Sequence, residues 1–296
     1  MACSRKPLIF DDSDGQELRI NTVNTYLKKK FGMKMVKLSI DGGFTCPNRD
    51  GTKGVGGCLF CSASGSGDTA AGSGDIIADL DSQITLLSDK WPSAGYIAYF
   101  QSHTNTYAPV TELREKFCAA LEHPSVKGIA IATRPDCLPD DVVDLLAELN
   151  EKTFMWVELG LQTIHAETAA KMNLCYTLDD YDLAVKKLIS RSIPVVTHLI
   201  LGLPGETREM MLDSVKHVCS RGIFGIKLHM FNLVKGSPME KLYPDYVSFD
   251  SIEEYTDLVI SALELIPPQV TVHRISGDAP RSTLISPAWS YKKRTI

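Results

Sequence analysis

The sequence lacks any long apolar segment. No run of about eighteen consecutive apolar residues, the length that a membrane-spanning helix needs, occurs in its 296 residues. The first six residues, Met-Ala-Cys-Ser-Arg-Lys, are not followed by the apolar core of a secretory signal peptide. We therefore expect a cytoplasmic protein with no membrane association.

The sequence also lacks the cysteine pattern of a disulfide scaffold. Its eight cysteines are spread over a chain that is 44% hydrophobic and long enough to bury a full core. Three of them fall within sixteen residues, which suits a reducing compartment. The other five are expected to be ordinary thiols: Cys3, Cys118, Cys137, Cys175 and Cys219.

There is no excess of positive charge. The formal net charge is −5, so the chain has no general electrostatic attraction for nucleic acid, and any RNA contact must come from a local patch. One candidate patch is the run Lys28, Lys29, Lys30, Lys34 and Lys37, and another is the tail with His273, Arg274, Lys292, Lys293 and Arg294. A solvated face is the ordinary alternative for such a run.

The cysteine group lacks a fourth member. Cys46, Cys58 and Cys61 are spaced C-x11-C-x2-C, with glycines between the first two. A structural zinc site normally has four protein ligands, whereas three thiolates can hold a [4Fe–4S] cluster and leave one iron open. The spacing favours the cluster, with a zinc knuckle as the alternative, and Phe60 is expected to shield the site.

Several collinear segments make the chain resemble the radical S-adenosylmethionine (SAM) superfamily, and within it the YhcC/YtqA-like family. These segments are residues 41–61, 96–109, 133–136, 158–163, 198–207 and 227–237, and the resemblance covers nearly the whole chain. The segment Thr-Arg-Pro-Asp at 133–136 is similar to the catalytic subunit of Elongator, and Gly-Leu-Pro-Gly-Glu-Thr at 202–207 to oxygen-independent coproporphyrinogen oxidase. The resemblance implies a cluster on the three cysteines, bound SAM, and a 5′-deoxyadenosyl radical that abstracts hydrogen from the substrate.

Alternating apolar runs and helical patterns indicate an α/β fold. Strands are expected at residues 35–40, 96–101, 128–133, 155–162, 195–201 and 225–233, with helices between them at 76–90, 110–122, 140–150, 178–190 and 206–221. This rhythm fits a doubly wound sheet or a barrel, and the resemblance selects a partial (β/α)6 TIM-type barrel. We expect an N-terminal helical segment at 1–34, with its helix at 16–31, then the barrel at 35–240 and a helix-strand extension at 241–296 that looks short for the family.

The resemblance also implies SAM-binding positions at the strand ends. They are Phe60, Gln101, Thr133, Glu158, Gln162, His198, Leu201 and Gly202, with Gln162 at a ribose position and Leu201 and Gly202 beside adenine. Glu158, Gly160 and Gln162 share one face of their strand, and an internal hydrogen-bonded pair is the alternative for the two polar residues. A core histidine is the alternative for His198.

One departure from the family concerns the SAM carboxylate. Related sequences place an arginine where this chain has Leu174, so either another cation such as Lys227 replaces it or SAM binds more weakly. The usual Gly-Gly-Glu after the second strand is also absent, and Gln101 stands in that region. Arg134 and Asp136 are expected either to contact substrate or to form an ion pair.

Lys227, His229 and Lys235 are the expected catalytic residues, placed to meet an anionic substrate group at the barrel mouth. The family link to wobble-uridine modification predicts a radical SAM enzyme acting on the C5 substituent of that tRNA base. A small molecule or a peptide is the alternative substrate, and a non-catalytic metal-binding module is the alternative function. A reductant such as flavodoxin or ferredoxin is an expected partner.

Overall fold

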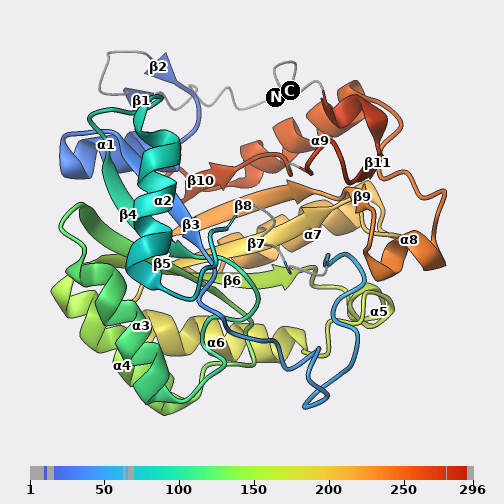
Figure 1. The fold of residues 1–296 in the computed structure, drawn as a ribbon. Helices are drawn as coiled ribbons and strands as arrows, with labels where there is room; N and C mark the ends of the chain where they lie inside the picture. Colours follow the sequence, from blue (N-terminus) through green and yellow to red (C-terminus); the bar gives the residue numbers. More distant parts are fainter. Residues whose placement is uncertain (1–9, 12–16, 63–64, 66–69, 278, 292–296) are drawn as a thin grey trace.

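The computed structural model describes residues 10–11, 17–62, 65, 70–277 and 279–291, and it is built on one curved parallel sheet (Figure 1). The sheet has seven strands in the order β10-β8-β7-β6-β5-β4-β3. Their bounds are Met35–Ile40 (β3), Gly95–Phe100 (β4), Val126–Thr133 (β5), Phe154–Gln162 (β6), Val195–Leu201 (β7), Gly225–Met230 (β8) and Thr271–Arg274 (β10). Neighbouring strands follow one another in sequence without the reversal of a doubly wound sheet, so the predicted partial barrel is confirmed.

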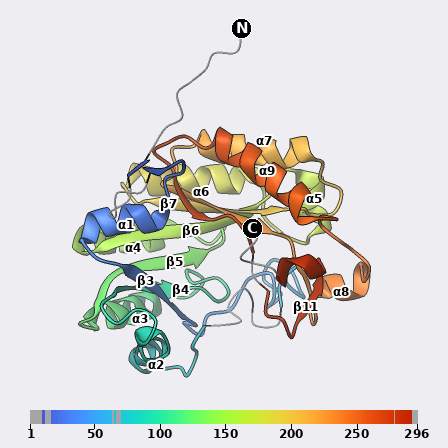
Figure 2. The same cartoon turned by 90° about the horizontal axis from the view of Figure 1, so that it is seen from above.

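Helices cover the outer face of this sheet (Figure 2). The helices between successive strands are Ile76–Ser88 (α2), Val110–Glu122 (α3), Asp140–Lys152 (α4), Leu178–Ser190 (α6), Arg208–Cys219 (α7) and Ile252–Leu265 (α9). Two short helices, Ala166–Lys171 (α5) and Pro238–Leu242 (α8), lie at the carboxyl ends of the strands together with Leu233–Val234 (β9), Leu284–Ser286 (β11) and the 3-10 helix Ala288–Tyr291 (η1). None of the described helices is long and apolar enough to span a bilayer.

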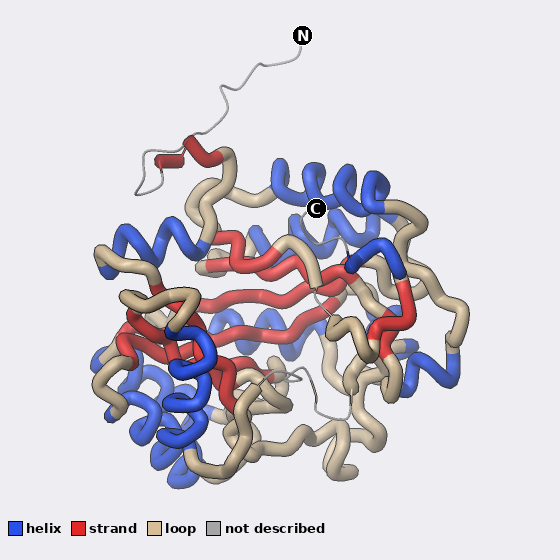
Figure 3. The backbone as a smooth tube through the Cα atoms, turned by 45° about the horizontal axis from the view of Figure 1, so that its top comes forward, coloured by secondary structure: helices blue, strands red, loops and turns tan. Residues whose placement is uncertain are grey.

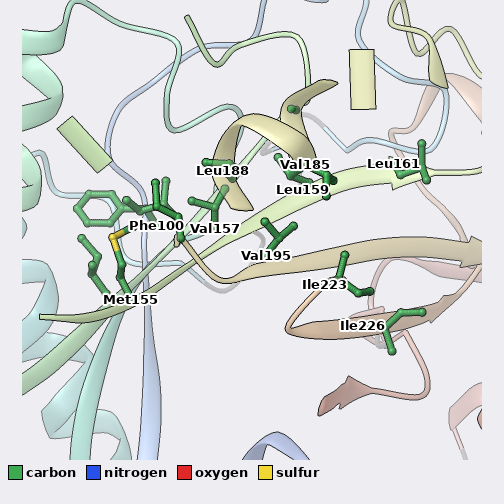
Figure 4. Packing of buried hydrophobic residues seen from close by; sticks show 14 of the residues in the cluster. Phe100, Met155, Val157, Leu159, Leu161, Val185, Leu188, Val195, Ile223 and Ile226 are labelled. Carbon is green, nitrogen blue, oxygen red and sulfur yellow. The ribbon is translucent and has the colours of Figure 1, made fainter. Parts of the chain in front are cut away.

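Strand residues alternate between two environments. In β6, Met155, Val157, Leu159 and Leu161 point toward the helices and join the main hydrophobic core (Figure 4). The intervening residues, Trp156, Glu158, Gly160 and Gln162, therefore point into the half-barrel. Trp156 is completely buried there and packs with Ile97, Tyr99 and Val196 in a separate cluster.

A short helix covers the N-terminal ends of the strands. Helix α1 (Val23–Phe31) begins after Thr22, whose side chain accepts a hydrogen bond from the N–H of Thr25, and ends at Gly32. The expected helix at 16–31 is therefore shorter, and the segment before it contains Glu17–Leu18 (β2), which pairs with Phe10–Asp11 (β1). The ring of Tyr26 packs on Phe154 and Phe224, which lie at the starts of β6 and β8.

Candidate active site

The cysteine loop, residues 41–62, leaves β3 and crosses the carboxyl ends of the strands (Figure 3). Asn48 anchors it, since its Nδ2 donates to the carbonyl of Asn173 and lies 3.5 Å from Sγ of Cys58. Asn173 in turn donates to the carbonyl of Gly57 at 2.8 Å. A Cβ at Gly54 would lie 2.1 Å from Oδ1 of Asn48, so that position requires glycine. The segment that follows α5 thus determines the shape of the loop.

The three predicted ligands, Cys46, Cys58 and Cys61, are half-buried free thiols in this loop. Over the described ranges, no three His, Cys, Asp or Glu side chains are grouped so that they could hold a single metal ion. Zinc holds each thiolate at about 2.3 Å from one centre, whereas each thiolate of a [4Fe–4S] cluster binds a different iron. Three thiolates are one ligand short of a closed zinc site and match the number that a [4Fe–4S] cluster with one open iron needs, so the donor set fits the cluster.

An apolar cluster lies against the cysteine loop. It consists of Met172, Leu174, Leu203, Phe231, Leu233 and Met239, and Cys58, Leu59 and Phe60 pack against it. Leu174 is 1% exposed. Leu174, where the resemblance implied an arginine, is thus part of the apolar support of the loop.

Inside the half-barrel, one buried carboxylate gathers several donors. Oε1 of Glu158 accepts from Nε1 of Trp156 at 2.8 Å, and Oε2 accepts from Nε2 of His198 at 2.9 Å and from Lys227. Lys37 lies 3.7 Å away, and Lys227 also donates to the Tyr99 hydroxyl at 3.0 Å. Burial would raise the pKa of Glu158, but Lys227 and Lys37 bring it well below its usual range. Glu158 is therefore a carboxylate.

Two histidines lie next to each other beside this network. Burial and the charge of Lys227 lower the pKa of His198 to about 4, so the imidazole is neutral and donates from Nε2 to Glu158. The His229 ring lies 5.1 Å from that of His198, and burial lowers its pKa well below the usual range. Nε2 of His229 is buried and has no hydrogen-bond partner in the described part of the chain. Of the expected catalytic residues, His229 is the one with an unused polar atom in the interior.

Gln162 ends β6 in an unusual backbone conformation. Its φ is 70°, and the register between β6 and β7 shifts between Gly160 and Gln162. A Cβ at Gly160 would lie 2.6 Å from Nε2 of Gln162, so the amide folds back over this glycine. Glu158 bonds to Trp156, His198 and Lys227, and no hydrogen bond joins it to Gln162 among the described residues. A strained polar residue at a strand end is typical of a binding position.

The other expected SAM positions divide between side-chain and backbone roles. Gln101 directly follows β4, and its N–H donates to the carbonyl of Ile40 at 3.2 Å. The hydroxyl of Thr133 is bonded to Thr106, and the side chain of Leu201 packs in the outer core. Gly202 accepts at its carbonyl from the Tyr246 hydroxyl at 2.9 Å. Thr133, Leu201 and Gly202 can therefore offer a cofactor only their backbone edges.

The remaining expected catalytic residues lie apart from each other. Lys227 is 3% exposed and paired with Glu158, so it lies below the mouth and is not available as a replacement for the missing arginine. Lys235 lies in the exposed loop between β9 and α8, where its N–H donates to the carbonyl of Thr283 at 2.8 Å. Lys37 was expected in the basic run and not in the interior, and Tyr99 was not expected at the site. Both alternate with apolar neighbours on the inner faces of β3 and β4.

The ion pair expected for Arg134 and Asp136 is present. Nε and Nη2 of Arg134 each donate to one Asp136 oxygen at 2.9 Å. Lys53, from the cysteine loop, adds a third contact to Asp136 at 2.8 Å. The pair therefore ties the β5–α4 turn to the cysteine loop.

The expected RNA patch on α1 lies at the other end of the strands from the cysteine loop (Figure 1). Lys30 packs over the ring of Phe154 at the start of β6, and Lys34 packs over Trp91. Lys28, Lys29 and Lys30 of this run do not border the barrel mouth, which favours the solvated-face interpretation for them. Lys37 of the same run lies inside the half-barrel, 3.7 Å from Glu158. Of the second patch, Lys292, Lys293 and Arg294 lie outside the described residues.

Comparison with known proteins agrees with this geometry. The Radical SAM superfamily matches residues 46–218, and the Radical_SAM C-terminal domain matches residues 223–296. YtqA of Bacillus subtilis is 50% identical over 94% of this chain and 87% of its own length, and YhcC of Escherichia coli is 38% identical over 93% and 89%. The tRNA uridine(34) acetyltransferase of Methanocaldococcus jannaschii is 25% identical over 59% of this chain and 32% of its own length.

A solved structure shares the fold. The Elp3 protein of Methanocaldococcus infernus superposes with a TM-score of 0.63 at 17% identity, over 85% of this chain and 58% of that one. The match to the superfamily begins at Cys46 and includes the three cysteines and the carboxyl ends of β4, β5, β6 and β7. The chain therefore belongs to the radical SAM superfamily, whose members use a [4Fe–4S] cluster and SAM, and within it to the YhcC/YtqA-like family.

Proposed function

We propose that this radical SAM enzyme modifies the C5 substituent of the wobble uridine in tRNA, with hydrogen abstraction from a carbon of that substituent. The observation that carries this proposal is the combination of the half-barrel site with a relative named for tRNA uridine 34. The shared fold with Elp3 supports the same half-barrel scaffold.

The residues for this chemistry come from the strand ends. When bound, the cluster and SAM supply reductive cleavage of the sulfonium and hydrogen abstraction from an unactivated carbon. Cys46, Cys58 and Cys61 would hold the cluster, while Gln162 and the backbone edge at Gly202 would orient SAM. The network around Glu158 fixes the side chains beneath that position, and Trp156 and α1 exclude water from the other end of the barrel.

Charges inside the half-barrel suit an anionic substrate group. The two oxygens of Glu158 already accept hydrogen bonds from Trp156, His198 and Lys227. Lys37 lies farther from Glu158, at 3.7 Å, and is a cation left for another anion. Arg274 is exposed, pairs in register with Lys227 across β10 and β8, and has no ion pair within the described ranges. Positive charge thus exceeds negative charge along the inner face, and Lys37, Arg274 and His229 are placed to receive a phosphate or a charged substituent.

RNA recognition on this chain would depend on one inserted base. With a net charge of −5, affinity for tRNA should be modest and should fall steeply with salt. An unpaired anticodon base can leave its stack and enter the mouth, where Lys235 would meet its backbone. The physiological reductant would be a flavodoxin or a ferredoxin.

The deciding experiment compares the modified nucleosides of tRNA from cells with and without the gene. We expect deletion to change one C5-substituted wobble uridine, and the purified enzyme to form deoxyadenosine faster when tRNA from the deletion strain is added. Unchanged wobble nucleosides together with no stimulation by tRNA would contradict the proposal, and a small molecule or a peptide would then be the substrate.

A further inference from the structure

Arg134 is a buried cation that lies between the sheet and the cysteine loop. It directly follows β5, is 7% exposed, and uses Nε and Nη2 to bind Asp136. Its guanidinium carbon lies 4.8 Å from the ring centre of Tyr176, whose hydroxyl donates to the carbonyl of Gly160 at 2.5 Å. Stacking and the two-point contact with the carboxylate fix the plane of the guanidinium.

The third nitrogen of this guanidinium is unused. Nη1 of Arg134 is buried and has no hydrogen-bond partner among the described residues. An arginine with two nitrogens bound to a carboxylate and the third left without an acceptor is costly to bury. A cofactor bound beside Arg134 could supply an acceptor for Nη1. This would explain why the guanidinium is buried with one nitrogen unpaired.

Two contacts connect Arg134 with the cysteine loop. Asp136, which Arg134 binds, also binds Lys53 of the cysteine loop at 2.8 Å. Tyr176, over which the guanidinium stacks, packs against the same apolar cluster as Cys58. Arg134 therefore lies next to the segment that carries the three ligands.

Arg134, Asp136 and Lys53 together carry one positive charge. Arg134 and Lys53 are cations and Asp136 is their shared anion, 2.8 Å from Lys53 and 2.9 Å from Arg134. Net charge and hydrogen bonds to sulfur are the main ways in which a protein sets the potential of an iron–sulfur cluster. A positive unit next to the cluster stabilises its reduced, more negative form.

We propose that Arg134 is a positioning residue for the cluster: its Nη1 donates toward the cluster sulfurs, and the Arg134–Asp136–Lys53 group raises the reduction potential. This inference rests on the cofactor that the proposed function requires and is independent of the substrate. Failure of the tRNA experiment would leave it intact, and failure of the test below would leave the substrate assignment intact.

The test is an EPR-monitored redox titration of the cluster in the anaerobically reconstituted protein, with iron and sulfide content measured on each sample. Arg134→Gln and Lys53→Gln each remove one positive charge and should lower the midpoint potential, with the larger shift at Arg134. Asp136→Asn removes the negative charge and should raise it. Opposite signs at residues that contact each other are not expected from a general loss of structure.

The matched control is Arg114→Gln. Arg114 also pairs with a carboxylate, Glu148 at 2.7 Å, but this pair lies on exposed helices and should leave the potential unchanged. Equal potentials in the wild type, Lys53→Gln and Asp136→Asn at full iron content would overturn the inference, as would shifts of the same sign in both variants. If Arg134→Gln does not fold, the Lys53 and Asp136 variants decide the question, since Lys53 is solvent-exposed.

Discussion

Both carboxylate oxygens of Glu158 accept hydrogen bonds from neighbouring side chains. A buried carboxylate is tolerated when charge and hydrogen bonds compensate for its lost hydration, and Lys227, His198 and Trp156 supply both. The same contacts keep Lys227 from moving toward a ligand. Lys227, an expected catalytic residue, is therefore paired with Glu158, and its catalytic role stays a prediction.

His198 should make stability depend on pH. Its pKa is about 4 in the folded state against 6.5 in the unfolded chain, so the unfolded state binds more protons between these values and stability falls as pH is lowered. Between pH 7.5 and pH 5.5, the titration of His198 should lower the free energy of unfolding by about 1 kcal/mol. Urea unfolding of wild type and His198→Gln at both values measures it, because glutamine keeps a donor to Glu158 but does not titrate. An equal pH dependence in both proteins would contradict this prediction.

The three cysteines should be equivalent in iron binding. Replacing Cys46, Cys58 or Cys61 by alanine should abolish iron incorporation during anaerobic reconstitution, because each thiolate binds a separate iron. Cys118→Ala and Cys219→Ala are the controls, since both thiols pack against the main core beneath the helices. Stoichiometric zinc without iron in the wild-type protein would instead support the zinc-knuckle alternative.

At the scale of elements, the end of β6 combines strain with a polar side chain. A residue other than glycine at φ 70° costs on the order of 1 kcal/mol, so Gln162→Gly should be more stable than Gln162→Ala by about that amount. Both variants should bind SAM more weakly than wild type if the amide contacts the ribose. Equilibrium dialysis and urea unfolding separate the two effects, and normal SAM affinity in both variants would exclude a role for the side chain.

The segment after α5 supports the cysteine loop through apolar contacts. Leu174→Arg would place a guanidinium among Met172, Leu203 and Phe231, so we expect a loss of roughly 3 kcal/mol in unfolding free energy and no gain in SAM affinity. Leu174→Met is the control, with a cost under about 1.5 kcal/mol. Tighter SAM binding by a stable arginine variant would show that the family's carboxylate contact can be restored here.

Regular elements were predictable because their apolar periodicity is local. The strands at 35–40 and 195–201 and the helices at 110–122 and 178–190 have the predicted bounds. The helix expected from residue 206 begins at Arg208 because Thr207 caps it. The short helices α5 and α8 were not predicted, because helices of six and five residues show too little apolar periodicity. The division of the chain near residues 35 and 241 stays a prediction.

The candidate site was predictable where its residues lie close in sequence. The spacing of the three cysteines and the alternation of Glu158 with Gln162 were visible, but the partners of Glu158 were not. Lys227 is 69 residues away, and its contact depends on the stagger of β6, β7 and β8. Pairing between distant strands is set by tertiary packing, so a single sequence could place Lys227 on the inner face but could not show that Glu158 binds it.

For the whole molecule, the expected site residues gather at one end of the half-barrel. The cysteine loop and the strand ends with Gln162 and Gly202 lie at the carboxyl end, while α1 covers the other end (Figure 2). The two ends of the half-barrel are about 20 Å apart, the length of a strand of six residues. A base bound at the mouth can reach α1 only if the rest of the tRNA runs along the side of the barrel.

If tRNA is the substrate, as proposed, this separation predicts which lysines contact it. Lys235→Glu should weaken tRNA binding and reduce the slope of log affinity against log salt by about 1, as expected for one lost phosphate contact. Reversing the charges of Lys28, Lys29 and Lys30 together should change affinity and slope much less, and should leave SAM cleavage without tRNA unchanged. Filter binding at several salt concentrations measures both. An equal or larger loss in the triple variant would mean that the RNA extends along the strands to α1, and the patch there would then be part of the binding surface.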